Sequence, residues 1–282
     1  MVSQIWPNPG RLRVAMPKLI ATDLDGTLIR SDGTVSERTV AAVARAEEAG
    51  LAVVMVTGRP PRWMHGIARQ LGHRGQAICA NGAVLYDLHT ETIVSRRTIE
   101  PDLLAELVGR LRAVLPELGF AVEYGEGFLF ESHYNLGRWD ARSWGGEAVE
   151  DDKALTARPA TKLLALHPPT DMEELLRRAH EEIGDLVTIT HSSGRALLEI
   201  SALGVTKASA LSDYCAERSL TPADVVAFGD MPNDLPMLAW AGHAYAMGNA
   251  HRDVLAAVPL RTASNDQDGV AQVIETLLEP PA

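Results

Sequence analysis

Two aspartates separated by one apolar residue follow a short apolar run near the start of the chain. The acids belong to Asp23-Leu24-Asp25-Gly26-Thr27, and the run spans residues 18–22. In an open α/β sheet, ligands bind in the loops at the carboxyl ends of the strands. Two carboxylates in one such loop repel each other, so each needs a cation or a proton. The pair therefore predicts a reactive site, and the simpler alternative is a cap on the N-terminus of a helix.

Three further polar clusters end apolar runs or open helical patterns later in the chain. The letters TGR at 57–59 follow the apolar run 52–56, and GDMPND at 229–234 follows the run 225–228. The letters GVTK at 204–207 open a helical pattern with a lysine at its start. Because each cluster ends a strand or begins a helix, we expect all of them at the same edge of a sheet.

In this order, the motifs DLDGT, TGR, a late lysine and GDxxND resemble those of the haloacid dehalogenase (HAD) superfamily of phosphotransferases. Two further matches, NGA at 81–83 and the stretch 198–207, resemble the Cof-like branch, whose members carry a large α/β cap (subclass IIB). Two positions depart from the family pattern. Ala208 stands where glycine is frequent, and Met231 where asparagine is frequent. Neither position supplies a charge, so the expected chemistry does not depend on them.

The resemblance assigns the acids to phosphoryl transfer. It implies that Asp23 is the nucleophile and forms an aspartyl-phosphate intermediate. Asp25 would give a proton to the leaving alcohol and then take one from the attacking water. Asp230 would bind Mg²⁺ together with the Asp23 carboxylate and the Asp25 backbone carbonyl, which are hard oxygen ligands. Asp234 would orient a metal-bound water or the lysine from a second shell, and its alternative is a surface charge.

The same resemblance assigns phosphate contacts to the loops. Thr57 would offer its hydroxyl and Gly58 its backbone N–H to the phosphoryl oxygens. Leu24 would contact the phosphate from within the first motif. Lys207 would hold both the nucleophile and the phosphate with one point charge. Taken alone, Lys207 is equally typical of a solvated lysine at a helix start.

Three more residues are candidates with open alternatives. Arg59 either contacts phosphate, faces solvent or pairs with an acid. Asn81 either touches the substrate or stabilises a turn. Asn233 either donates to a phosphate oxygen, supports the loop or caps a helix.

The elements that must position these residues alternate between strands and helices. Residues up to about 80 read β-α-β-α-β, and the alternation returns from Lys207 to about residue 278. This pattern predicts an α/β fold with a doubly wound, Rossmann-like parallel sheet. Hairpins and helices between the two parts predict an inserted α+β cap. We expect the core at 16–84 and 201–282 and the cap at 85–200.

The cap is expected to determine substrate specificity. Its polar and aromatic stretch, residues 132–135 and 138–146, has little periodicity and is a plausible recognition loop. An ordinary cap surface has the same composition.

Composition limits the partners. The chain has 282 residues, 22% charged residues and a formal net charge of −11. Nucleic-acid binding needs clustered Lys and Arg, so we expect no nucleic-acid partner. No apolar stretch is long enough to span a bilayer. The two cysteines, Cys79 and Cys215, lie in apolar or helical patterns and favour a reducing compartment. We expect a cytoplasmic monomer or homodimer, with residues 1–15 as a loose extension and Met16 as an alternative start.

Together these features predict an enzyme, a phosphoric monoester hydrolase that needs Mg²⁺. Its partner would be a small phosphorylated metabolite, either a sugar phosphate or a cofactor or nucleotide phosphate. One alternative is a sugar phosphomutase similar to the phosphomannomutases, which would return the phosphoryl group to a sugar. The other is a non-catalytic binding or regulatory module. Such a module is expected to lose at least one of Asp23, Asp25, Lys207 and Asp230, and all four are present.

Overall fold

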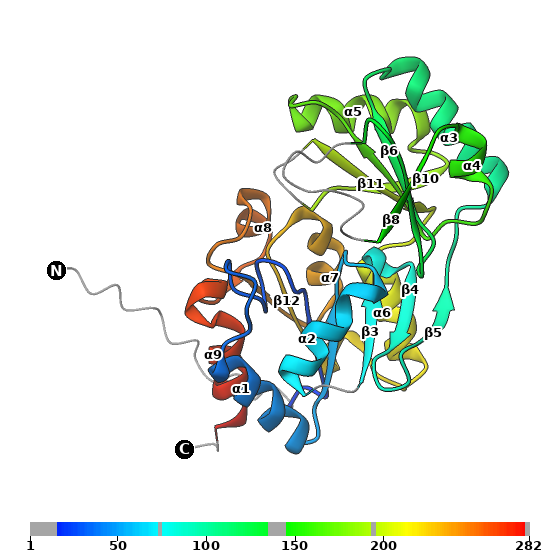
Figure 1. Ribbon diagram of the computed structural model, residues 1–282. Helices are drawn as coiled ribbons and strands as arrows, with labels where there is room; N and C mark the ends of the chain where they lie inside the picture. The colour runs from blue at the N-terminus through cyan, green and yellow to red at the C-terminus, as the bar shows by residue number, and fades with distance from the viewer. Residues whose placement is uncertain (1–15, 73–74, 135–144, 193–195, 280–282) are drawn as a thin grey trace.

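The computed structural model describes residues 16–72, 75–134, 145–192 and 196–279. The expected extension over residues 1–15 lies outside this part. The described chain folds around two β-sheets, one of eight strands and one of six (Figure 1). No helix in these ranges is long and apolar enough to cross a membrane.

The larger sheet has the strand order β14-β13-β12-β1-β2-β3-β4-β5. Its strands are β1 (Leu19–Thr22), β2 (Ala52–Val56), β3 (Gln76–Cys79), β4 (Val84–Asp87), β5 (Thr92–Arg96), β12 (Val225–Gly229), β13 (His243–Ala246) and β14 (Leu260–Arg261). Every pairing from β14 through β3 is parallel. The expected doubly wound α/β core is therefore confirmed.

Helices cover both faces of this sheet. They are α1 (Glu37–Glu48), α2 (Met64–Leu71), α6 (Lys207–Ala216), α7 (Leu235–Trp240), α8 (Arg252–Ala257) and α9 (Gly269–Leu278). Helix α1 contacts α2 and α9, while α6 contacts α7, and α7 contacts β12 (Figure 1). One-turn 3-10 helices are η1 (Pro61–Trp63), η2 (Ala80–Gly82), η4 (Pro222–Asp224), η5 (Pro232–Asp234) and η6 (Asn265–Gln267).

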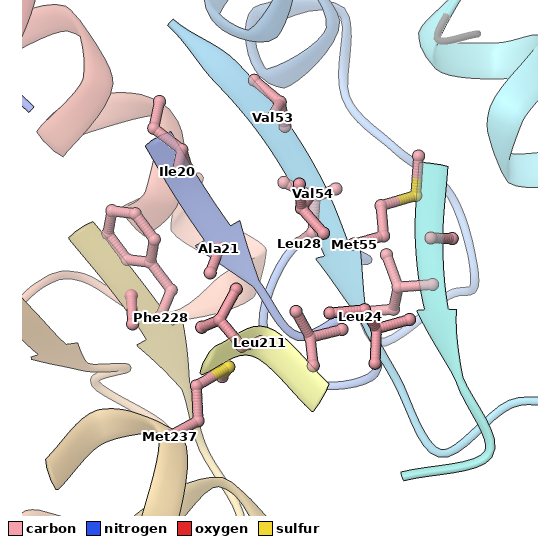
Figure 2. Packing of buried hydrophobic residues seen from close by; sticks show 14 of the residues in the cluster. Ile20, Ala21, Leu24, Leu28, Val53, Val54, Met55, Leu211, Phe228 and Met237 are labelled. Atoms are coloured by element: carbon pink, nitrogen blue, oxygen red, sulfur yellow. The ribbon is translucent and has the colours of Figure 1, made fainter. Parts of the chain in front are cut away.

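Strand β1 lies at the centre of the core. It pairs with β12 on one side and β2 on the other, and all of its residues are buried. Figure 2 shows Ile20 and Ala21 of β1 packed between Phe228 of β12 and the apolar side chains of β2, with Met237 of α7 close by. The apolar composition of this strand follows from its coverage by helices on both faces. The central position of β1 fixes the loop that follows it, where the paired aspartates lie.

The hairpin of β4 and β5 extends the larger sheet. Strand β4 pairs antiparallel with β3, and β5 pairs with β4. From the sequence we expected the inserted cap to begin at residue 85. The strand pairing instead places this hairpin in the core sheet. The hairpin covers the edge of β3, whose unpaired backbone groups would otherwise be exposed. The sequence could not indicate this pairing because hairpins have the same local signature in either sheet.

The second sheet has the strand order β10-β11-β9-β6-β7-β8. Its strands are β6 (Gly119–Glu123), β7 (Phe128–Glu131), β8 (Gly146–Val149), β9 (Lys162–Leu166), β10 (Val187–Thr190) and β11 (Leu197–Ala202). Its helices are α3 (Pro101–Val114), α4 (Asp152–Thr156) and α5 (Met172–Ile183). Strand β8 and helix α4 were not predicted, because both are short and lack a clear apolar period.

Alternate residues of the second sheet face different environments, as the two-residue period of strands requires. Leu163 and Ala165 of β9 pack into the cluster that contains the buried residues of α3 and α5. Leu164 and Leu166 pack instead against a smaller cluster that contains Phe128 and Phe130. In Figure 1, the helices α3 and α5 lie on the side of this sheet away from the core. The smaller cluster therefore belongs to the face turned toward the core.

The cysteines have no disulfide. Cys79 and Cys215 are both free and buried. Burial raises the pKa of the Cys79 thiol to about 12, so it stays protonated at neutral pH. Cys79 behaves as a small apolar side chain of the core, and Cys215 is buried in the same cluster.

Candidate active site

Three buried carboxylates meet at the ends of two adjacent strands. Asp23 follows β1, and its backbone N–H donates to the Phe228 carbonyl of β12 at 3.0 Å. Asp230 follows β12, so the parallel pairing of the two strands brings the two acids together. Oxygens of Asp23, Asp230 and Asp234 lie within 4.8 Å of one another. The structure thus assembles the three acids that the sequence analysis proposed around a metal.

Lys207 lies between two of these acids. Its Nζ donates to Asp23 Oδ1 at 2.5 Å and to Asp234 Oδ1 at 2.6 Å. Thr206 caps the start of α6 by accepting the Ser209 N–H, which fixes the point where the lysine side chain leaves the helix. Lys207 is fully buried, so the alternative of a solvated lysine is wrong.

Asp234 is held from both sides. One oxygen accepts from Lys207, and Oδ2 accepts the backbone N–H groups of Asp230 and Met231, each at 3.0 Å. Asp234 is fully buried, so the alternative of a surface charge is also wrong. These contacts orient Lys207 and shape the loop that carries Asp230.

The first motif supports Asp230 through two small residues. The Thr27 hydroxyl donates to Asp230 Oδ1 at 3.0 Å. Gly26 has a φ of +76°, and a Cβ at this position would lie 2.3 Å from Asp230 Oδ2. Only glycine therefore fits the close approach of this loop to the carboxylate.

The site has more negative than positive charge. Burial, and then the neighbouring Asp234 and Asp230, raise the pKa of Asp23, although Lys207 acts in the opposite direction. Burial and Asp234 raise the pKa of Asp230 to about 7. Against burial, Asp23 and Asp234 raise the pKa of Lys207, which keeps it protonated. When the three acids are ionised, they and the protonated lysine carry a net charge of −2, which a divalent cation neutralises.

The donor set fits Mg²⁺. Carboxylate oxygens are the hard ligands that this ion prefers, and it normally keeps waters and substrate oxygens as its other ligands. Asp23 and Asp230 are the acids best able to bind directly, because both oxygens of Asp234 already accept hydrogen bonds.

Asp25 lies in the same loop but in a different environment. Its side chain is 59% exposed and receives two hydrogen bonds from Arg59, from Nε to Oδ2 at 2.8 Å and from Nη2 to Oδ1 at 2.5 Å. Of the three possibilities for Arg59, the structure adopts pairing with an acid. Both side chains line the same cavity as Asp23.

The loop after β2 contributes backbone groups to the site more than it contributes side chains. The Thr57 hydroxyl is buried and accepts the Arg59 N–H at 3.1 Å. Gly58 lines the cavity, whereas Thr57 is outside its described lining. The Leu24 side chain packs in the core, which leaves its backbone for any contact with a phosphate.

Asn81 and Asn233 connect the site to the second sheet. Asn233 Nδ2 donates to Asn81 Oδ1 at 3.2 Å, and Asn81 Nδ2 donates to Glu199 at 2.7 Å. Asn81 has a φ of +57°, so it also forms the tight turn that was its alternative role. Asn233 lines the cavity, and its buried Oδ1 has no hydrogen-bond partner within the described ranges.

Sequence reasoning missed a buried ion pair on the second sheet. Lys162 Nζ donates to Glu199 Oε2 at 2.6 Å and to the Gly58 carbonyl at 2.8 Å. The Ser192 hydroxyl also donates to Glu199. Against burial, which acts to raise it, these donors and Asn81 hold the pKa of Glu199 below its usual value. The available signal was a charged residue inside an otherwise apolar strand.

A second missed pair joins the core to the second sheet. Arg62 of η1 donates to both oxygens of Glu123 of β6, at 2.5 and 2.8 Å. Glu123 is buried, and it was detectable in the same way, as an acid that ends an apolar strand.

Several of these groups line one cavity of about 400 Å³ between the two sheets. Its lining includes Asp23 and Asp25 from the core and Lys162 and Glu199 from the second sheet. Of the predicted recognition stretch, Tyr134 also lines the cavity. Residues 135–144 of that stretch, with both of its tryptophans, lie outside the described residues.

The fold and site define an α/β protein with a buried carboxylate and lysine centre at the carboxyl ends of parallel strands. Residues 20–274 match the family model of the haloacid dehalogenase-like hydrolases. The chain belongs to this family. The expected superfamily is confirmed, and so is the expected class of enzyme, a phosphatase of this hydrolase family.

Two curated relatives match most of the chain. A 5-amino-6-(5-phospho-D-ribitylamino)uracil phosphatase of Bacillus subtilis is 30% identical over 257 residues, which cover 91% of this chain and 94% of the relative. A pyridoxal phosphate phosphatase of Escherichia coli is 26% identical over 268 residues, which cover 91% and 97%.

Solved structures show the same fold. A haloacid dehalogenase-like hydrolase of Bacteroides thetaiotaomicron has a TM-score of 0.76 and 26% identity, with 93% of this chain and 100% of that chain covered. A protein of Streptococcus mutans has a TM-score of 0.83 at 22% identity, with 93% and 99% covered.

Proposed function

We propose that this protein is a Mg²⁺-dependent phosphatase that hydrolyses a small phosphate monoester through an aspartyl-phosphate intermediate. The observation that supports it most strongly is the position of Asp23. This buried carboxylate contacts Lys207, lies beside Asp230 and lines a cavity large enough for a small metabolite. Asp25 lies at the same cavity, where it can exchange protons.

The first step is attack on the phosphate ester. An oxygen of the Asp23 carboxylate attacks phosphorus, and the bond from phosphorus to the ester oxygen breaks. Asp25 gives its proton to the leaving alcohol. Lys207 supplies positive charge beside the nucleophile, and Mg²⁺ bound at Asp23 and Asp230 would neutralise charge on the phosphoryl oxygens.

The second step is hydrolysis of the acyl phosphate. Asp25, now a carboxylate, takes a proton from the attacking water. The water oxygen attacks phosphorus, the bond to Asp23 breaks, and inorganic phosphate leaves. Both carboxyl groups return to their starting states, so no other reactant is consumed.

We propose that the second sheet and its helices are the cap that binds the leaving group. Lys162 reaches from β9 to the Gly58 carbonyl, which ties this sheet to the phosphate loop. The names of the two relatives give a ribitylaminouracil phosphate and pyridoxal phosphate as their substrates, which supports a small phosphorylated metabolite as the substrate here. A sugar phosphate and a cofactor or nucleotide phosphate both belong to this class.

The test is phosphate release from a panel of phosphomonoesters, with Mg²⁺ and with a chelator, for the wild type and Asp23→Asn. We expect release that needs Mg²⁺ and disappears in the variant. Metal binding is measured independently as a rise in melting temperature with Mg²⁺, which Asp230→Asn should abolish. Transfer of phosphate between sugar positions without free phosphate would contradict the proposal and support a mutase.

A further inference from the structure

The face of the second sheet turned toward the core forms an apolar wall of the catalytic cavity. Phe128 of β7, Leu164 of β9 and Leu197 of β11 all line the cavity that contains Asp23. Strand alternation separates them from the residues that pack under α3 and α5. This apolar surface and Asp23 line the same cavity, so one molecule can contact both of them.

Two more aromatic side chains complete this wall. Trp63 enters from η1 of the core, and Tyr134 follows β7. The rings of Phe128 and Tyr134 meet edge to face with centroids 6.2 Å apart. Aromatic rings favour such offset and edge contacts with other rings.

The charged side chains of the lining are already paired. Glu123 accepts two hydrogen bonds from Arg62, and Glu199 accepts from Lys162, Ser192 and Asn81. A ligand with many hydroxyl groups could bond to Asn233 Oδ1, which has no partner among the described residues, but would have to compete for these other partners, because a buried hydroxyl without a hydrogen bond is penalised. The wall therefore favours a leaving group with few hydroxyls.

We propose that the cavity selects phosphate monoesters whose alcohol carries an aromatic or heteroaromatic ring, which packs against Trp63, Phe128, Tyr134, Leu164 and Leu197 while the phosphate lies at Asp23. This inference rests on the proposed phosphatase activity and specifies its substrate class. The cavity of about 400 Å³ is large enough for such a ring and the phosphate.

The experiment compares primary alkyl phosphates, so that the leaving alcohols have similar reactivity. The substrates are benzyl phosphate, cyclohexylmethyl phosphate, glucose 6-phosphate and methyl phosphate. We expect kcat/KM for benzyl phosphate to exceed that for glucose 6-phosphate by about tenfold or more. It should also exceed that for cyclohexylmethyl phosphate by about twofold or more, because the ring contacts are specifically aromatic.

Variants of the wall residues test whether the ring of the substrate binds at this wall. Leu164→Ser and Trp63→Ala should each lower kcat/KM for benzyl phosphate about tenfold and change it less than about twofold for methyl phosphate. Leu166→Ser is the matched control, because Leu166 lies two residues further on the same strand face and outside the described lining. The melting temperatures of all three variants show whether a loss of kcat/KM comes from a lost contact with the substrate or from a destabilised fold.

Each outcome has one interpretation. Faster hydrolysis of glucose 6-phosphate, equal rates for the benzyl and cyclohexylmethyl esters, or equal effects of Leu164→Ser and Leu166→Ser would overturn the inference. With any of these results, Asp23-dependent phosphate release would leave the proposed function standing. If the folded, Mg²⁺-loaded wild type hydrolyses none of the esters, the proposed function fails and the inference fails with it.

Discussion

Arg59 holds the Asp25 carboxylate with two parallel hydrogen bonds, from Nε at 2.8 Å and from Nη2 at 2.5 Å. Bidentate pairing fixes both the position and the plane of a carboxylate. In the proposed mechanism, Asp25 must reach the leaving oxygen and later the attacking water. In this proposed mechanism, Arg59 would therefore position the proton-transfer group.

Replacing Arg59 should slow the chemical step more than it weakens binding. We expect Arg59→Ala to lower kcat about 10- to 100-fold, because a small displacement of a catalytic group has a large effect on rate. Arg59→Lys should recover only part of the loss, since an ammonium cannot make the two parallel bonds. Steady-state kinetics on one good substrate measure both. A kcat for Arg59→Ala equal to that of the wild type would contradict the positioning role.

Gly26 and Gly33 offer a matched pair of substitutions in one loop region. Both have positive φ, +76° and +84°, so alanine strains each backbone by about 1–2 kcal/mol. Only at Gly26 would the new Cβ collide with Asp230 Oδ2, whereas nothing lies within 4 Å at Gly33. Gly26→Ala should therefore lose Mg²⁺ binding and phosphate release, while Gly33→Ala keeps both. Mg²⁺ titrations followed by melting temperature make the comparison, and equal metal affinity in the two variants would contradict it.

Lys207 should be essential for stability when no metal is added. Its removal leaves Asp23 and Asp234 as neighbouring buried acids without their shared cation. We expect Lys207→Met to reduce the free energy of unfolding by about 3–5 kcal/mol in the presence of a chelator. Lys18→Met is the control, since the Lys18 side chain is 62% exposed in its pair with Asp224 and should have little effect. Urea unfolding measures the free energy of unfolding of both variants. Equal losses of stability in Lys207→Met and Lys18→Met would show that burial of the ion pair is not the cause.

The buried pair of Glu199 and Lys162 predicts a stability difference that depends on pH. Because the pKa of Glu199 is lowered in the folded protein, ionised Glu199 stabilises the fold above its unfolded pKa of about 4.3. This contribution is lost as pH falls through the lower, folded value. Glu199→Gln should be destabilised by about 3–5 kcal/mol at pH 7, since the buried Lys162 ammonium loses its carboxylate partner. The difference from the wild type should shrink below pH about 4.

An exposed pair provides the control for this pH dependence. Glu173 on α5 bonds Arg252 on α8, and both side chains are more than three-quarters exposed, at 80% and 76%. Glu173→Gln should show no measurable change at either pH. Urea unfolding at pH 7 and pH 3 tests both variants. A Glu199→Gln difference that stays constant with pH would contradict the assignment of the effect to ionised Glu199.

Much of the fold followed from periodicity and turn residues. Ser36, the apolar stripe of α1 and Gly50 predicted that helix, and Ser36 indeed caps it by accepting the Thr39 N–H. The central strands were predictable because burial on both faces requires continuous apolar runs. Strand β8 and helix α4 were missed because elements of four and five residues contain too little pattern.

The residues of the candidate active site could be predicted from the sequence, but their contacts could be predicted only in part. Asp23, Asp230 and Lys207 follow or begin elements, so the fold rule brought them to one edge. The Arg59 pairing was left open because a loop arginine can reach several partners. Lys162 and Glu199 were missed as a pair because their contact joins strands 37 positions apart in the chain. A partner at that distance is fixed by sheet order, which local patterns do not specify.

The most direct test of the proposed mechanism is a search for phosphate on Asp23 during turnover. With 4-nitrophenyl phosphate the leaving group needs no proton, so Asp25→Asn should still be phosphorylated but should lose the base for hydrolysis. The reaction is quenched in acid, digested with pepsin and analysed by mass spectrometry. The proposed mechanism predicts phosphate on the peptide that contains Asp23 and none when Asp23→Asn is added. A burst of 4-nitrophenol without a phosphopeptide, or with phosphate at another residue, would contradict it.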